Sequence, residues 1–171
     1  MRKVILNIAV SLDGYIEGPN GEFDWCFTDQ DYGMTDFMNR VDTIFFGRKS
    51  YELVLKMESK AYHDKMKYVF SKTIKHMEGN AQLINRDVEE RVNTIKNQKG
   101  KDIWLFGGAG LISSFMNYGL VDEMQLAIHP LLLGMGKPLF KGIKKKMEFK
   151  LSDIKTYSTG LVQSFYELDK R

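Results

Sequence analysis

Residues 102–123 limit the possible folds more than any other part of the sequence. The stretch begins with an apolar run typical of a buried strand, continues with Gly107, Gly108 and Gly110, and ends in apolar residues at helical spacing. A glycine turn between a strand and a helix leaves backbone N–H groups free at the positive helix end, and no Cβ keeps a phosphate away. The stretch therefore predicts a strand, turn and helix that hold a phosphate-bearing ligand, or a turn that only packs the helix tightly on the sheet.

The position of this turn argues against a standard dinucleotide-binding fold. Residues 108–113 lack the last glycine of the GxGxxG pattern. That pattern opens its domain, whereas too little chain follows Gly110 to build the second half of a doubly wound sheet. We therefore expect a different α/β arrangement.

Composition and charge narrow the class of protein. The chain has 171 residues, 43% of them hydrophobic, which suits one domain, residues 1–171, with a real core. A net charge of +3 with scattered basic residues does not favour a nucleic-acid partner. No apolar run approaches the about 20 residues of a membrane span, so we expect no membrane association.

The cysteine and histidine content and the first residues argue against a disulfide-bonded, metal-binding or secreted protein. Cys26 is the only cysteine and the three histidines are scattered, so we expect no disulfide and no metal site. The basic start and the apolar run after it imitate a signal peptide, but Asn7 interrupts the run and no cleavage site follows. We expect a strand there and a cytoplasmic protein.

The other apolar runs predict alternating strands and helices. Residues 3–10 are nearly all apolar, as in a strand that is covered on both faces of a parallel or mixed sheet. Further strands are expected at 43–46, 67–70, 81–84, 103–106 and 124–130, helices at about 29–39, 51–55, 88–97 and after Gly110, and a hairpin at 149–157 and 161–168. The turn cluster at 18–21 predicts a mobile loop.

Two more strand ends and one loop carry candidate binding residues. GRKS, residues 47–50, and SKT, residues 71–73, offer cations and hydroxyls that bind phosphate, or that make an ordinary helix start and turn. Phe23 and Trp25 follow the glycine-rich loop. Their flat rings suit the wall of a pocket for a flat heterocycle, or they anchor the loop.

Five segments together resemble the dihydrofolate-reductase-like superfamily. They are SLDGYIEGPNGEFDW, FFGRKSYE, VFSKT, IWLFGGAGLISSFMNYGLVDE and IHPLLLGMGKPLF, and they occur in the family's order over nearly the whole chain. Within the superfamily, the chain is most similar to the reductase domain of the bifunctional riboflavin-biosynthesis deaminase-reductase, and we expect no deaminase half.

The resemblance implies a fold, a cofactor and an activity. The fold is a three-layer α/β sandwich with a central mixed, mostly parallel sheet, helices on both faces and a C-terminal antiparallel hairpin. The implied protein is a homodimer that uses NADPH to transfer hydride to a pterin-, pyrimidine- or flavin-like ring, as dihydrofolate reductase and 5-amino-6-(5-phosphoribosylamino)uracil reductase do. One alternative is an NADP(H)-binding sensor or scaffold without efficient catalysis. A further alternative, which rests on composition alone, is nucleic-acid binding through the lysine-rich residues 141–150, a run that is usually a solvated loop.

The resemblance also implies contacts to the cofactor, residue by residue. The pyrophosphate would be held, and the nicotinamide approached, by the turn of Gly107, Gly108, Ala109, Gly110 and Leu111. Further phosphate contacts would come from Gly47, Arg48, Lys49 and Ser50. The adenosine ribose and its 2′-phosphate would meet Ser71, Lys72 and Thr73, and the nicotinamide would be bordered by Ala9 and Ile16. A cation that meets the 2′-phosphate favours NADPH over NADH by roughly ten- to hundredfold. Arg48, Lys49 and Lys72 are the available donors.

A catalytic acid is harder to assign. The cofactor carries the hydride, but reduction of a C=N bond or a carbonyl also needs a proton. In dihydrofolate reductase a buried acid on the helix after the tryptophan assists. The position that corresponds to this acid is nearest Asp31 when it is counted back from Gly47, but it falls on Gln30 when it is counted forward from Trp25. Asp31, with Asp29 as its competitor, is therefore the candidate acid, or else a helix-start residue favoured by the macrodipole.

Overall fold

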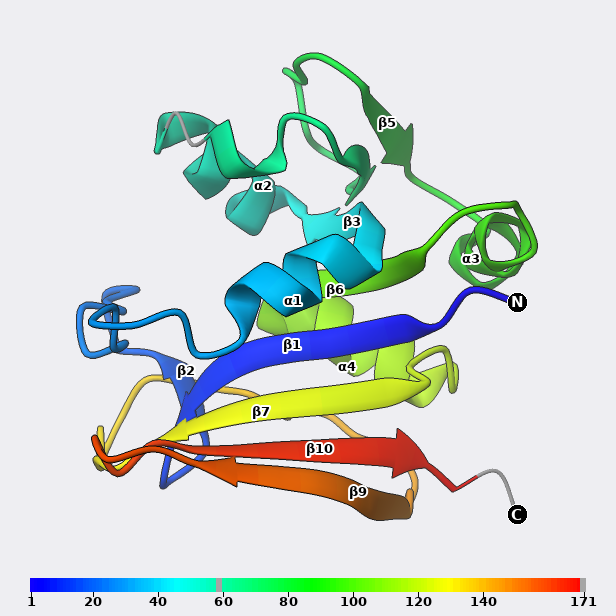
Figure 1. Cartoon of the computed structure of the whole chain (residues 1–171). Helices are drawn as coiled ribbons and strands as arrows, with labels where there is room; N and C mark the ends of the chain where they lie inside the picture. The colour runs from blue at the N-terminus through cyan, green and yellow to red at the C-terminus, as the bar shows by residue number, and fades with distance from the viewer. Residues whose placement is uncertain (58–59, 170–171) are drawn as a thin grey trace.

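The computed structural model describes residues 1–57 and 60–169, which are built around an eight-stranded sheet (Figure 1). The strand order is β5-β4-β3-β6-β1-β7-β10-β9, and every neighbouring pair is parallel except β7 with β10 and β10 with β9. The strands are β1 (Val4–Ser11), β3 (Val41–Gly47), β4 (Met66–Phe70), β5 (Ala81–Ile84), β6 (Asp102–Gly107), β7 (Glu123–His129), β9 (Phe149–Thr156) and β10 (Val162–Leu168). The predicted mixed, mostly parallel sheet with a C-terminal hairpin is confirmed.

Helices cover both faces of the sheet and make the three predicted layers (Figure 1). On one face, α1 (Met34–Arg40) and α2 (Arg48–Lys56) bury Phe37, Tyr51 and Val54 against the sheet. On the other face, α3 (Val88–Lys96) and α4 (Ala109–Asn117) bury their apolar side chains in a second cluster. None of the helices in the described part of the chain is long and apolar enough to cross a bilayer.

Two helix starts differ from the prediction. The first helix was expected from about residue 29, but α1 begins at Met34, because Tyr32 and Gly33 take left-handed backbone angles, φ 50° and 75°, that end any earlier helical turn. The second was expected at 51–55, but α2 begins at Arg48, directly after the strand. The basic residues at 48–49 therefore lie in the first turn of a helix and not in a loop before it.

A second, two-stranded sheet was not predicted. β2 (Tyr15–Glu17) pairs antiparallel with β8 (Lys137–Pro138), and a short 3-10 helix lies at Lys60–Tyr62. The segment before residue 18 was expected only to lead into a mobile loop. Local patterns cannot reveal β2, because its partner lies more than a hundred residues further along the chain.

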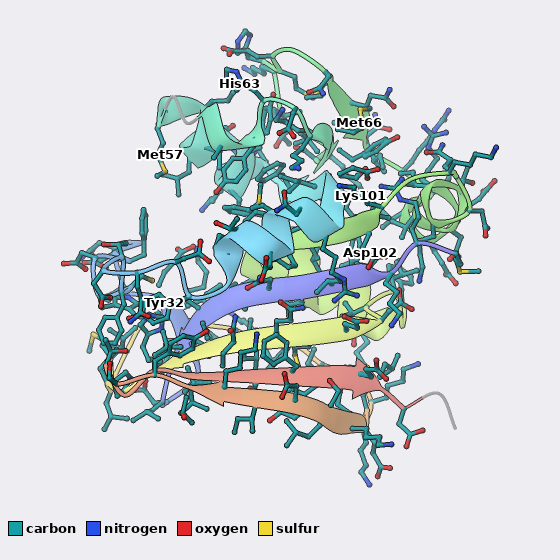
Figure 2. All side chains as sticks on the ribbon, in the orientation of Figure 1. Tyr32, Met57, His63, Met66, Lys101 and Asp102 are labelled. Carbon is teal, nitrogen blue, oxygen red and sulfur yellow. The ribbon has the colours of Figure 1, made fainter. Side chains whose placement is uncertain are left out.

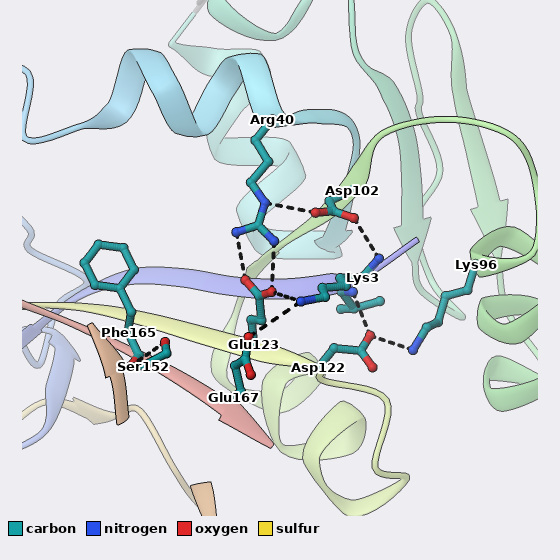
Figure 3. Close-up of polar contacts among 10 residues, drawn as sticks. Lys3, Arg40, Lys96, Asp102, Asp122, Glu123, Ser152, Phe165 and Glu167 are labelled. Carbon is teal, nitrogen blue, oxygen red and sulfur yellow. Dashed lines mark hydrogen bonds and ion pairs between the residues drawn. The ribbon is translucent and has the colours of Figure 1, made fainter. Parts of the chain in front are cut away.

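The amino ends of the central strands are joined by charged side chains (Figure 3). Arg40 contacts Glu123 at 2.8 Å and Asp102 at 2.9 Å, and Lys3 contacts Glu123 at 2.5 Å. Burial alone would raise the pKa of Glu123, but hydrogen bonds from Arg40 and Lys3 lower it below its ordinary value. This network ties α1 to β1, β6 and β7 and leaves the carboxyl ends of the strands free to build a site.

Candidate functional site

A cavity of about 1320 Å³ opens where β3 and β6 end. The two strands are parallel neighbours, and each passes through glycine directly into a helix, β3 into α2 and β6 into α4. Neither helix has a side-chain cap at its N-terminus, so free N–H groups point out of both first turns. Two positive helix ends side by side suit an anion such as a phosphate.

The glycines allow the two turns to approach each other closely. A Cβ on Gly47 would lie 3.2 Å from the backbone nitrogen of Gly108, and a Cβ on Gly107, whose φ is +113°, would lie 3.2 Å from Ile112. The peptide bond between Gly107 and Gly108 is cis. A Cβ on Gly110, in contrast, would meet no atom within 4 Å. Glycine is thus needed for packing at Gly47 and Gly107, whereas Gly110 leaves open space in the lining.

Cations dominate the lining of the cavity. Arg48 contacts Glu52 one turn further along α2 at 3.2 Å, and Lys137 of β8 pairs with Glu17 of β2. Lys49, Lys56 and Lys141 line the cavity as well. The cations outnumber the acids, so the lining favours a ligand with several negative charges.

The β2–β8 sheet forms a further wall of the cavity. Gly136 lies so close to β2 that a Cβ there would be 2.1 Å from the carbonyl oxygen of Glu17. The loop after β2 is held by Glu22, whose carboxylate accepts hydrogen bonds from the backbone and side-chain nitrogens of Asn20 at 2.8 and 2.7 Å. Phe23 follows this loop and lines the cavity.

The structure brings many of the predicted binding residues into this one lining. They are Phe23, Gly47, Arg48, Lys49, Ser50, Gly108, Ala109, Gly110 and Leu111. Gly107 ends β6 beside them, Ala9 lies half-buried in β1, and Ile16 of β2 is buried in the core. The roles of these residues toward a cofactor remain predictions.

The third predicted turn lies next to this cavity and not in it. The Ser71 hydroxyl accepts hydrogen bonds from the backbone N–H groups of Thr73 and Ile74, which makes a local turn. Lys72 lines a second hollow of about 620 Å³, together with Tyr118 at the end of α4. Phe70, at the end of β4, lines the first cavity, and Lys72, two residues further along the chain, lines the second hollow.

Trp25 lies away from the cavity lining. Its ring packs edge-on against His129 at a centroid distance of 5.2 Å. His129 accepts the N–H of Phe27 through Nε2 at 3.1 Å, and burial lowers its pKa, which keeps the ring neutral. Tyr32 extends this aromatic group near the ends of β1 and β7 (Figure 2). Its ring packs against that of Tyr157 at a centroid distance of 4.8 Å. These contacts support the alternative that Trp25 anchors its loop.

Asp31 lies in an exposed turn before α1. Its carboxylate accepts hydrogen bonds from the backbone nitrogen and the hydroxyl of Thr35 at 3.0 and 2.7 Å. The hydroxyl bond is the largest of the effects that lower the pKa of Asp31. Asp29 likewise has a lowered pKa, chiefly through the hydroxyl of Tyr32 at 2.7 Å. Ionised, exposed carboxylates of this kind support the helix-start alternative, because a proton donor needs a raised pKa.

Comparison with known proteins settles the family. The sequence model of the RibD C-terminal domain matches residues 2–163. The chain belongs to this family. It is 49% identical to the uncharacterized protein YyaP of Bacillus subtilis strain 168 over 96% of this chain and 94% of YyaP.

Solved structures agree with the assignment. A putative riboflavin biosynthesis protein from Shewanella sp. PV-4 has a TM-score of 0.88 and 26% identity, with 99% of this chain and all of the other covered. A dihydrofolate reductase from Enterococcus faecalis, complexed with NADP(H), has a TM-score of 0.73 and 11% identity over 98% of this chain and 97% of its own. The RibD C-terminal domain of this protein therefore has the dihydrofolate-reductase-like fold.

The wall that β8 contributes was missed from the sequence. Lys137 and Lys141 line the cavity, yet residues 141–150 read as a solvated lysine-rich loop. The available signal was Gly136 with Lys137 directly after it, since a glycine near a strand often marks a close backbone approach.

Proposed function

We propose that the protein is an NADPH-dependent reductase that transfers hydride to a small pterin-, pyrimidine- or flavin-like ring. The observation that carries this proposal is a single cation-lined cavity between two uncapped helix starts. Its shape and charge suit a long dinucleotide with several phosphates. Membership of the RibD C-terminal domain family supports a reductase, because relatives of this fold are named as reductases.

The lining fits such a cofactor. The open space beside Gly110 leaves room for a phosphate at the first turn of α4, and Gly47, Arg48, Lys49 and Ser50 offer donors from α2. Ser71, Lys72 and Thr73 are proposed to meet the adenosine ribose and its 2′-phosphate. Ala9 and Ile16 are proposed to border the nicotinamide. When bound, NADPH would supply the hydride, and the protein would orient both reactants and exclude water.

The substrate ring is proposed to lie against Phe23. Phe23 lines the cavity and is 42% exposed, and Leu53 of α2 lines it too at 38% exposure. Exposed apolar side chains inside a concave site suit a flat heterocycle. Trp25 would then act through the loop that carries Phe23.

The alternative is an NADP(H)-binding sensor or scaffold without efficient catalysis, and one observation favours it. The acids that line the cavity in the described part of the chain, Glu17 and Glu52, are both paired with cations, and Asp31 is exposed and ionised. A ground-state acid ready to protonate a substrate is therefore lacking among these side chains. Water or the substrate itself would have to supply the proton.

Calorimetric titration with NADPH and then NADH tests the proposal. We expect NADPH to bind with a micromolar dissociation constant and NADH roughly ten- to hundredfold more weakly, because only NADPH offers a 2′-phosphate to a cation. Absorbance at the nicotinamide band with a panel of ring substrates then separates reductase from sensor. Binding of neither nucleotide would refute both readings.

Quaternary structure and location belong to the same proposal. We propose a homodimer, for which light scattering of the purified protein should give twice the chain mass of 19.8 kDa. A single-chain mass at micromolar concentration would reject the dimer. A cytoplasmic location likewise remains a prediction.

A further inference from the structure

A loop after β8 adds one more cation to the lining of the cavity. Lys141 lines the cavity together with Gly110, Leu111 and Ser114. Gly110, Leu111 and Ser114 belong to α4, so Lys141 and the first turns of this helix line the same cavity. The charge of Lys141 therefore adds to the attraction of the free N–H groups for an anion bound in this cavity.

The backbone on both sides of Lys141 is fixed. Before it, Leu139 is only 2% exposed, and its N–H donates to the carbonyl of Gly14 at 2.8 Å. After it, the side chain of Asn117 donates to the carbonyl of Gly142 at 3.0 Å and accepts the N–H of Lys144 at 2.9 Å. The main chain at residue 141 is thereby held between the core and the end of α4.

The side chain of Lys141, in contrast, is committed to no other group among the described residues. Lys137 pairs with Glu17, and Lys146 pairs with Glu148 at 2.5 Å. Lys141 is exposed, and within residues 1–57 and 60–169 its ammonium has neither a carboxylate nor a carbonyl partner. A cation that is not neutralised by a carboxylate keeps its full attraction for a bound anion.

We infer, on the basis of the proposed function, that Lys141 is a further cofactor-binding residue whose ammonium group donates a hydrogen bond to the pyrophosphate. The pyrophosphate is the target because Lys141 shares the lining with the first turns of α4. The 2′-phosphate is proposed to lie near Lys72, which is not part of the lining that holds Lys141. Lys141 thus strengthens binding of NADPH and NADH alike.

Calorimetric titration of four proteins with NADPH and with NADH tests this inference. Lys141→Gln should raise both dissociation constants by about tenfold, the lower end of what a hydrogen bond to a charged group contributes. Lys141→Arg should retain most of the affinity, because arginine keeps the charge and the donor. Lys145→Gln is the matched control: this exposed lysine lies on the same loop but outside the cavity lining, and its removal should change neither constant.

Asn117 offers a second readout for the same role. If it positions the loop, Asn117→Ala should weaken binding in the wild-type chain but add little in the Lys141→Gln background, so that the two changes are not additive. Full additivity would contradict a positioning role. Thermal unfolding of each variant verifies that the fold is retained.

The possible failures can be told apart. If the wild-type chain binds neither nucleotide, the proposed function fails and the inference fails with it. If the wild-type chain binds NADPH and Lys141→Gln binds it equally well, only the inference is overturned. A loss confined to NADPH, with NADH unaffected, would overturn the assignment to the pyrophosphate.

Discussion

Side chains near the cavity differ in whether they already have an ion-pair or hydrogen-bond partner. Arg48 contacts Glu52, and Asp31 accepts two hydrogen bonds from Thr35, whereas Lys141 has no such partner in the described part of the chain. A carboxylate that is already satisfied in its ionised form resists protonation. The chemistry of a residue here therefore follows from its neighbours more than from its type.

Replacement of Asp31 by Asn tests whether it is a catalytic acid. Because Asp31 is exposed and bonded to Thr35, we expect turnover of any substrate found by screening to change little and thermal stability to fall slightly. Steady-state kinetics and thermal unfolding measure the two effects. A loss of turnover of about a hundredfold or more at unchanged stability would restore Asp31 as the proton donor.

At the scale of elements, the strand-to-helix turns determine where a ligand can bind. α4 begins at Ala109, and its second residue is Gly110, around which a Cβ would find open space. Alanine is a better helix former than glycine, so substitution here does not threaten the helix. Gly110 is thus the position at which the cavity can be filled while the fold is kept.

A graded series at Gly110 tests the cavity as the nucleotide site. Gly110→Ala should leave the free energy of unfolding unchanged or raise it by about 0.5–1 kcal/mol, while lowering NADPH affinity modestly. Gly110→Leu should abolish detectable binding, because its larger side chain occupies the phosphate position. Chemical denaturation and calorimetry measure both properties. Full NADPH affinity in a folded Gly110→Leu protein would place the cofactor elsewhere.

Elements with strong local patterns were predicted well from the sequence, and elements set by distant partners were not. Strand 81–84 and the hairpin near 149–168 agree with β5, β9 and β10. β2 was missed because its partner β8 is remote, and α1 starts late because Tyr32 and Gly33 take left-handed angles. Of the candidate site, the glycine turns could be located from sequence, but the exposure of Asp31 and the contact of Trp25 with His129 depend on tertiary packing.

For the molecule as a whole, charge is divided between the two ends of the sheet. Cations and carboxylates form ion pairs that join the amino ends of β1, β6 and β7. At the carboxyl ends of β3 and β6, in contrast, cations outnumber carboxylates around a cavity. The first arrangement supports the fold, and the second is the proposed ligand site. Stability and binding can therefore be altered separately.

The pH dependence of unfolding tests the amino-end network. Glu123 has a lowered pKa in the folded state, so its contribution is present above its unfolded value of about 4.5 and is lost as the pH falls through the folded value. Glu123→Gln should cost about 1–3 kcal/mol near neutral pH, because it removes the largely buried carboxylate that accepts hydrogen bonds from both Arg40 and Lys3. Urea unfolding at neutral and acid pH should show the difference from wild type shrinking in acid.

Glu167→Gln is the matched control for this network. Glu167 lies 3.7 Å from Lys3, but its side chain is 54% exposed. An exposed pair contributes little, so we expect less than about 0.5 kcal/mol at any pH. Equal losses for both variants would show that burial of Glu123 is not what gives the network its strength.

The order of the strands has a consequence for synthesis of the chain. Among residues 1–57 and 60–169, every residue that lines the cavity precedes Gly142, yet β7 pairs on one side with β10, which begins only at Val162. While residues 142–161 are being synthesised, the nascent protein already contains these lining residues, but one long edge of β7 still lacks its neighbour. An unpaired edge is a template for pairing with another chain. Synthesis of β9 and β10 therefore ends the interval in which this edge of β7 is open to pairing with another chain.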